Sequence, residues 1–256
     1  MRSVKPKKHL GQHFLRDDSI AAQIVAAISE PGEGEVVLEV GPGTGVLTRS
    51  FIEKNWDFYA YDLDEESVRY LHQQYPFHTN RVRLEDFLKL DLSTFDGPVS
   101  IVGNFPYNIS SQLLFQAYDH RQQVKEVVCM IQKEVADRIC ASHGSKVYGI
   151  LSVLLQAYYD AEYLFTVPPH VFDPPPRVNS AVIRLRRNGV SALDCDEKLF
   201  KRVVKEGFGK RRKTLRNALK ILNLPTSLTE DQTFDLRAEQ LSVGDFIALT
   251  KRIATA

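Results

Sequence analysis

A glycine loop between a short apolar strand and a helix is the feature that most restricts the fold. Residues 35–45, EVVLEVGPGTG, form a β-rich run that ends in closely spaced glycines, and the helical pattern of residues 46–55 follows at once. Further strand and helix patterns alternate behind this unit. The alternation predicts a parallel α/β sheet with right-handed crossovers.

The alternation changes character after about residue 141. Up to there, strands and helices are expected at residues 19–28 (helix), 35–40, 46–55 (helix), 57–64, 65–75 (helix), 81–92, 99–104, 110–120 (helix), 124–132 and 133–141 (helix). Two β runs then flank a proline-rich connection, at 161–167 and 180–187. Only helical patterns follow, at 197–208, 211–222 and 242–253. We therefore expect a Rossmann-like α/β domain with a basic N-terminal arm at 1–190 and a small all-α domain at 191–256.

The composition is that of an ordinary globular protein of one or two domains. The chain has 256 residues, of which 43% are hydrophobic and 25% charged. We expect no membrane span, because no segment approaches about 18 uncharged apolar residues. The basic N-terminus has no apolar core of a secretory signal. The three cysteines share no C-x-x-C spacing, which favours a reducing, cytoplasmic location.

The charge distribution is more informative than the net charge of +1. Residues 1–16 carry five Lys/Arg and no acidic residue, and residues 177–220 carry 14 basic and four acidic residues. The segment between them is acidic. Two basic segments of this kind favour a surface that binds a polyanion, although two solvated charged faces would give the same pattern.

The glycine loop is accompanied by acidic residues at three expected strand ends. Asp62 stands 21 residues after Gly41, where a carboxylate accepts both hydroxyls of a ribose. This placement suits a nicotinamide cofactor or S-adenosylmethionine. The dinucleotide motif requires glycine at position 46, where this chain has Val46. Glu39 would repel a pyrophosphate but suits an ammonium or sulfonium group, which favours S-adenosylmethionine.

Simpler roles exist for the same residues. Asp86 follows the third expected strand and is placed to accept from an adenine amino group, but it also suits a helix cap. Gly41, Gly43 and Gly45 suit a tight turn.

The segment GNFPYNIS places an amide and an aromatic ring at the end of another buried strand. Asn104 follows the apolar run 99–103, and its side-chain oxygen together with the Phe105 carbonyl would accept both hydrogens of an exocyclic purine amine. The proline stiffens the loop, and the Tyr107 ring offers a stacking face worth about 1–3 kcal/mol per base. The simpler alternative is an Asn-x-Pro turn beside a core tyrosine.

The proline-rich connection at 168–179 allows a related interpretation. A stiff loop could present Phe172 as the second face of a sandwich around a flipped base, with Arg177 nearby to meet phosphate. A rigid surface connection without a ligand is the alternative.

Several motifs together closely resemble one family, the small-subunit ribosomal RNA adenine dimethyltransferases. They extend from about residue 7 to about residue 250 and comprise HLGQHFL, LEVGPGTG, DLD, EDFLKLD, GNFPYNIS, QKEVADRI, YGILSVLLQ, VPPHVFDPPPRVNSAV, FGKRRKTLRNAL and RAEQLSVGDF. The resemblance implies S-adenosyl-L-methionine as cofactor. It also implies dimethylation of N6 in two adjacent adenosines near the 3′ end of 16S rRNA, within the assembling small subunit.

The resemblance implies particular site residues. The cofactor would be held by His13, Leu15, Glu39, Gly41, Gly43, Asp62, Asp86 and Asn104. The target adenine would be held by Asn104, Phe105, Tyr107 and Phe172. Two positions depart from the family, which usually has Asn at position 13 and Leu at position 105. With His13, a side-chain amide contact to the cofactor is not implied. Phe105 should be tolerated, because the backbone carbonyl is the acting group at that position.

Basic residues of the N-terminal arm and of FGKRRKTLRNALK are the expected RNA contacts. They are Lys7, Lys8, Arg177, Lys210, Arg211, Arg212, Lys213, Arg216 and Lys220. On a continuous helix, Arg212, Arg216 and Lys220 would share one stripe.

Other functions share parts of this pattern. A large-subunit rRNA adenine methyltransferase of the antibiotic-resistance type and an adenine-N6 DNA methyltransferase use the same chemistry. RRKTLRNAL and the lack of a sizeable target-recognition domain favour the small subunit. A binding protein that keeps the fold without catalysis and a dehydrogenase are further alternatives. We expect a monomer and no metal site, because His9 and His13 have no third ligand at suitable spacing.

Overall fold

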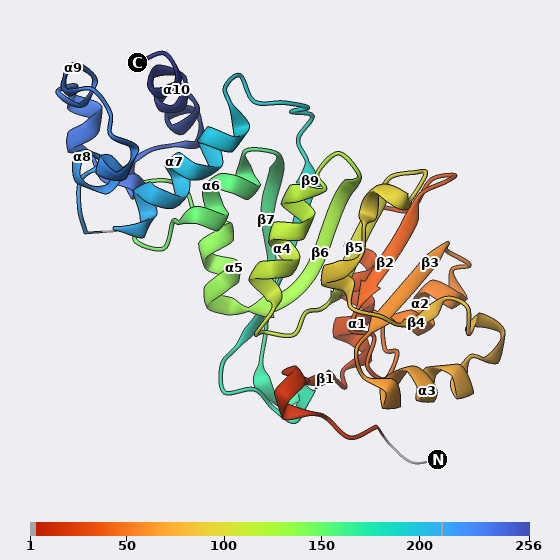
Figure 1. Cartoon of the computed structure of the whole chain (residues 1–256). Coiled ribbons are helices and arrows are strands. Elements are labelled where there is room, and N and C mark those ends of the chain that lie inside the picture. The colour runs from red at the N-terminus through yellow and green to blue at the C-terminus, as the bar shows by residue number, and fades with distance from the viewer. Residues whose placement is uncertain (1–3, 211) are drawn as a thin grey trace. The chain divides into compact units, whose positions relative to one another are not determined.

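The computed structural model describes residues 4–210 and 212–256, which form two compact units (Figure 1). Unit 1 comprises the chain up to residue 136 together with residues 162–187. Unit 2 comprises residues 137–161 and 188–256.

Unit 1 is built on a seven-stranded sheet with the order β4-β3-β2-β5-β6-β9-β7, although residues 159–161 at the start of β7 are assigned to unit 2. The strands are β2 (Val36–Val40), β3 (Phe58–Asp62), β4 (Val82–Leu84), β5 (Val99–Asn104), β6 (Val124–Gln132), β7 (Tyr159–Val167) and β9 (Ser180–Arg187). The pairs among β4, β3, β2, β5 and β6 are parallel, and β6 pairs with β9 antiparallel. This mixed sheet with its helices confirms the expected Rossmann-like α/β fold.

The helices of unit 1 follow the strands as the alternation predicts. They are α1 (Asp18–Ala26), α2 (Thr48–Glu53), α3 (Glu65–Gln74), α4 (Ser110–Asp119) and the first half of α5 (Lys133–Ile139), with short 3₁₀ turns η1 (Lys8–Leu10), η2 (Pro76–His78), η3 (Phe87–Lys89), η4 (Leu92–Thr94) and η5 (Pro169–Val171). The helix α4 packs on β6, and α3 packs on β3 and β4, so most side chains of the central strands are buried.

A separate two-stranded ladder joins the N-terminal segment to the proline-rich connection. In it, β1 (Phe14–Leu15) pairs antiparallel with β8 (Phe172–Asp173), with Leu15 opposite Phe172. The next residue of the chain, Arg16, donates its backbone N–H to the Val171 carbonyl at 2.8 Å.

Unit 2 consists of α6 (Ile150–Gln156), α7 (Glu197–Gly209), α8 (Leu215–Ala218), α9 (Thr226–Thr229) and α10 (Val243–Ala254), with 3₁₀ turns η6 (Leu219–Leu222), η7 (Gln232–Asp235) and η8 (Ala238–Gln240). The division differs from a single cut after residue 190, because residues 137–161 also belong to unit 2. The sequence ILSVLLQ of α6 is apolar almost all round, so α6 needs covering on several sides, and it packs against α7 and α10.

The basic segment of unit 2 differs from the continuous helix expected over 211–222. The helix begins only at Leu215, after an extended Thr214, and changes to a 3₁₀ turn at Leu219. Arg212 therefore precedes the helix, and the predicted stripe of Arg212, Arg216 and Lys220 does not form. The buried side chains of Leu215 and Leu219 determine where this short helix packs.

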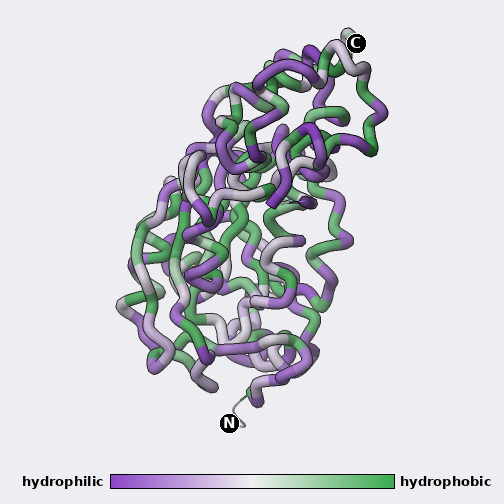
Figure 2. The backbone as a smooth tube through the Cα atoms, turned by 90° about the vertical axis from the view of Figure 1, so that its left-hand side faces the viewer, coloured by the Kyte–Doolittle hydropathy of each residue, from purple (hydrophilic) through white to green (hydrophobic). Residues whose placement is uncertain are grey.

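Hydrophobic and hydrophilic stretches are interleaved throughout both units, as Figure 2 shows. Within residues 4–210 and 212–256, no helix is long and apolar enough to cross a membrane.

Gly103 allows the end of β5 to lie close to β2. A Cβ atom at this position would meet the Val40 carbonyl oxygen at 2.5 Å. We predict that Gly103→Ala lowers the free energy of unfolding in urea by about 1–3 kcal/mol, because the backbone of β2 must move. Gly209→Ala is the matched control, since a Cβ there has no neighbour within 4 Å. Equal stability of the two variants would contradict this account.

Candidate active site

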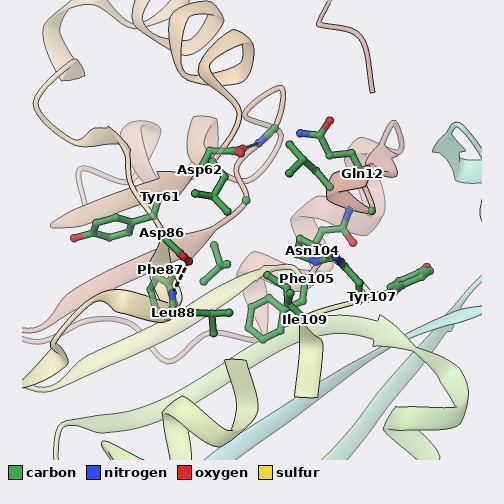
Figure 3. Close-up of a pocket in the computed structure, with 18 of the residues that line it drawn as sticks. Gln12, Tyr61, Asp62, Asp86, Phe87, Leu88, Asn104, Phe105, Tyr107 and Ile109 are labelled. Carbon is green, nitrogen blue, oxygen red and sulfur yellow. Dashed lines mark hydrogen bonds between the residues drawn. The ribbon is translucent and has the colours of Figure 1, made fainter. Parts of the chain in front are cut away.

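A pocket in unit 1 lies at the carboxyl ends of the parallel strands (Figure 3). Adjacent parallel strands end at the same edge of a sheet, so residues distant in the sequence meet there. Most of the expected site residues line this pocket: His13, Gly41, Gly43, Asp62, Asp86, Asn104, Phe105 and Tyr107. Leu15 and Glu39 line a second hollow that shares Gly41, Gly43 and Asn104 with the first.

Asp62 is a buried carboxylate at the end of β3. Its side chain accepts the backbone N–H of Gly43 at 3.3 Å and that of Asp64 at 2.9 Å. Burial nevertheless outweighs these hydrogen bonds and raises the pKa of Asp62 to about 6. A ligand with hydroxyl groups at this position would replace the water that the carboxylate has lost.

Asp86 holds the expected position after β4 and also takes the simpler role of a cap. Its side chain accepts from the Leu88 backbone N–H at 3.1 Å, at the start of η3. Around it the pocket is lined by apolar side chains that the sequence did not single out: Leu63, Phe87, Leu88 and Ile109. This apolar slot beside a carboxylate suits a purine base.

Glu39 is a fully buried acid at the end of β2. The Thr48 hydroxyl donates to it at 2.6 Å, yet burial raises the pKa of Glu39 to about 8, and the charge of Asp62 adds to this. A positive group in the adjoining hollow would favour the ionised carboxylate. The expected position beside an ammonium or sulfonium group is therefore electrostatically suitable.

Position 43 leaves no room for a side chain, so it requires glycine. Its φ is +54°, and a Cβ atom would lie 2.8 Å from the Phe14 ring. The glycine loop and the N-terminal segment are thus packed directly on each other.

The N-terminal strap, residues 7–15, is fastened to unit 1 by polar contacts. Gln12, which the sequence did not single out, donates to Asp64 at 3.0 Å and accepts the Lys7 backbone N–H at 2.7 Å. The Lys7 ammonium forms an ion pair with the buried Asp64 carboxylate and lies 3.8 Å from Glu66. Lys7, expected to contact RNA, is therefore occupied within the chain, whereas Lys8 is exposed.

Asn104 is oriented by the strap. Its Nδ2 donates to the His13 carbonyl at 2.7 Å, which leaves Oδ1 as a free acceptor. The Phe105 backbone N–H donates to the Met130 carbonyl at 3.0 Å, and the Phe105 ring is buried. One hydrogen bond thus holds the Asn104 side chain, which carries the first expected acceptor, and another holds the Phe105 backbone, which carries the second.

Tyr107 is held at its ring and at its hydroxyl. The His13 imidazole is stacked on its ring with centroids 5.4 Å apart and planes 30° apart, and the hydroxyl forms a hydrogen bond with Ser180. Figure 3 shows Tyr107 beside Asn104 at one end of the pocket.

Phe172 departs from the expected position. It is only 4% exposed, belongs to the hydrophobic core with Leu15 and Val171, and is absent from the pocket lining. Its pairing opposite Leu15 in the β1–β8 ladder turns the ring inwards. The structure therefore does not show it as the second face of a base sandwich.

Among residues 4–210 and 212–256, no group of three or more His, Cys, Asp or Glu side chains is arranged to hold a metal ion.

Comparison with known proteins identifies the family. The sequence model of the family described as "Ribosomal RNA adenine dimethylase" matches residues 3–255. The chain belongs to this family. It is 53% identical to "Ribosomal RNA small subunit methyltransferase A" of Cytophaga hutchinsonii over 256 residues, which cover 99% of each protein. A protein with the same name from Bacteroides thetaiotaomicron is 52% identical and is covered to 97%.

Solved structures agree with this assignment. A dimethyladenosine transferase from Plasmodium falciparum superimposes with a TM-score of 0.77 at 25% identity, covering 93% of this chain and 96% of that one. The 23S rRNA methyltransferase ErmE superimposes with a TM-score of 0.69 at 23% identity, covering 94% and 99%, and shows the shared fold. The chain is an rRNA adenine dimethyltransferase with S-adenosyl-L-methionine as cofactor, and the dehydrogenase alternative is excluded.

The residues present fit this cofactor. Asp62 offers a carboxylate for ribose hydroxyls, the slot beside Asp86 suits adenine, and the hollow beside Glu39 suits the methionine end. Which of these side chains contact the cofactor stays a prediction, including His13 and Leu15.

We predict that cofactor affinity depends on pH through Asp62. On the prediction that ionised Asp62 accepts from the ribose hydroxyls, lowering the pH from about 7.5 to about 5 should weaken cofactor binding, by up to about tenfold per pH unit below the pKa of about 6. Asp62→Asn should bind the cofactor more weakly, and its affinity should no longer fall as the pH is lowered through about 6. A separate change of affinity with pH, caused by Glu39 with its pKa of about 8, should persist. Calorimetric titration tests this, and an unchanged profile in Asp62→Asn would assign the dependence to another group.

Proposed function

We propose that the protein dimethylates N6 of two adjacent adenosines near the 3′ end of 16S rRNA during assembly of the small ribosomal subunit. It would act in the cytoplasm as a monomer. The observation that carries the proposal is the orientation of Asn104, whose amide nitrogen is bound to the His13 carbonyl so that its oxygen is free. The relatives named small-subunit methyltransferases support the choice of 16S rRNA.

Activation of the adenine amine follows from two acceptors. The lone pair of an exocyclic purine amine is delocalised into the ring, so the amine is a weak nucleophile. Asn104 Oδ1 and the Phe105 carbonyl accept its two hydrogens and favour a pyramidal nitrogen, whose lone pair is localised and points towards the methyl group. Because β5 and the strap fix both acceptors, little reorganisation is needed during the reaction.

The bound cofactor supplies an electrophilic methyl group on its sulfonium. The chain's residues orient the amine towards that group, and the amine proton, acidic once nitrogen carries the methyl, leaves to water. Tyr107 stacks on the base and keeps its amine level with Asn104. No side chain of shifted pKa is required as a base.

The exposed basic residues provide RNA contacts in each unit. In unit 1 these are Lys8 and Arg177, and in unit 2 they are Lys210, Arg212, Lys213 and Lys220. Arg211 lies outside the described residues. Arg216 differs, because it forms an ion pair with Asp235 at 2.6 Å and donates to the Thr229 carbonyl.

We predict that Asn104→Ala lowers methylation of under-modified small subunits by about 10²-fold or more, because one of two oriented acceptors is lost. Incorporation of labelled methyl groups measures this. Asn80→Ala, in an exposed loop, is the matched control.

The same assay tests the substrate. Wild-type enzyme should label small subunits that lack the modification and leave large subunits unlabelled. Labelling of large subunits alone would instead favour the antibiotic-resistance type of activity, and no labelling of either would refute the proposed function.

We further predict that basic residues of unit 2 differ in role. Arg212→Ala and Lys213→Ala should each weaken RNA binding and reduce the slope of log K against log salt by about 1. Arg216→Ala should mainly lower the thermal midpoint, because it removes the contacts with Asp235 and Thr229. Filter binding at several salt concentrations and thermal denaturation separate the two effects; the reverse assignment would contradict the structure.

A further inference from the structure

His13 contacts both groups that receive the target base. Its carbonyl accepts from Asn104 Nδ2 at 2.7 Å, and its imidazole is stacked on Tyr107 with ring centroids 5.4 Å apart. The ring is itself fixed, because Nδ1 lies 2.7 Å from the Pro174 carbonyl. A carbonyl oxygen only accepts, so Nδ1 carries the proton in this contact.

Tyr107 depends on such support because it projects from a loop. A tyrosine ring on a loop rotates about two torsions unless neighbours hold it. Ser180, fully buried at the start of β9, holds the hydroxyl end, and the His13 imidazole covers one face of the ring. In the proposed complex the base would stack on the opposite face, in a plane that these two contacts determine.

The support comes from an unexpected residue. Phe172, expected as the second ring around the base, is buried in the core. Among the residues that the structure describes, the ring stacked on Tyr107 is that of His13.

We infer that His13 is a positioning residue for the target adenine, acting through Tyr107 by its imidazole and through Asn104 by its carbonyl. The inference rests on the proposed function, since it concerns the same base site. The two contacts of His13 can be tested separately. Substitution of the side chain keeps the backbone carbonyl that binds Asn104 and removes only the imidazole that supports Tyr107.

The first test compares His13→Ala with the wild type. Loss of the aromatic contact should lower kcat/KM for under-modified small subunits by about two- to tenfold, the range expected for one ring pair. The dissociation constant for S-adenosyl-L-methionine, measured by calorimetry, should rise by less than kcat/KM falls, because the predicted cofactor contact of His13 accounts for only part of the loss. His13→Phe, which keeps a ring but loses the Pro174 contact, should recover part of the activity. His9→Ala, an exposed histidine of the same strap, is the matched control.

A double-mutant cycle identifies the route of the effect. In a Tyr107→Leu background the penalty of His13→Ala should vanish, because the ring that His13 supports is gone. Thermal midpoints of all variants show whether any loss comes from unfolding instead.

The contrary outcomes are distinct. Unchanged or improved kcat/KM in His13→Ala would overturn the inference, since the imidazole would then be neutral or would obstruct the base. A cofactor dissociation constant that rises as much as kcat/KM falls would make His13 a cofactor ligand instead. A penalty that persists fully without Tyr107 would also overturn it. Inactivity of the wild type on small subunits would refute the proposed function, independently of His13.

Discussion

The hydrogen bond from the Asn104 side-chain amide to the His13 carbonyl connects segments 91 residues apart. It holds the end of β5 against the N-terminal strap, and the pocket forms between them. Because the bond uses the amide nitrogen, the amide oxygen stays available as an acceptor. An aspartate at position 104 would lack this donor, and an alanine would lack both groups. This interaction, together with the contacts of Lys7 and Gln12 with Asp64 and the β1–β8 ladder, holds the strap in place, and it leaves the amide oxygen of Asn104 as the free acceptor.

Two acids at strand ends lie in surroundings that disfavour their charge. Burial raises the pKa of Glu39 to about 8 and that of Asp62 to about 6. Since both values lie above those of the unfolded chain, protonation of these acids stabilises the empty protein, and this contribution is lost as the pH rises through the raised values. Hydroxyl donors near Asp62 and a positive charge near Glu39 favour the ionised forms. Ligand binding thus offsets a cost that folding imposes on the empty site.

The sheet and its ligand-binding edge could be predicted because they follow from local patterns. Each apolar run ends in a polar residue such as Asp62 or Asn104, and parallel topology brings those ends together. The apolar slot was missed because Leu63 and Ile109 are not distinctive in sequence. The helix expected over 211–222 was wrong for a long-range reason: Arg216 binds Asp235, 19 residues away, and the burial of Leu215 sets the start of the helix. Neither the Arg216–Asp235 contact nor the burial of Leu215 can be predicted from the helical periodicity of the segment.

The positions of Phe172 and His13 depend on the register of the β1–β8 ladder. Leu15 lies opposite Phe172 and Phe14 opposite Asp173, so the same alignment brings His13 to Pro174, where its Nδ1 donates to the carbonyl. A shift of one residue would turn Phe172 out of the core and separate His13 from Pro174, because successive side chains of a strand point to opposite faces. Prolines around Phe172 indicate a stiff segment but do not specify this register. The ring that meets Tyr107 is therefore selected by the pairing of two-residue strands far apart in sequence, which is why the motif alone pointed to Phe172.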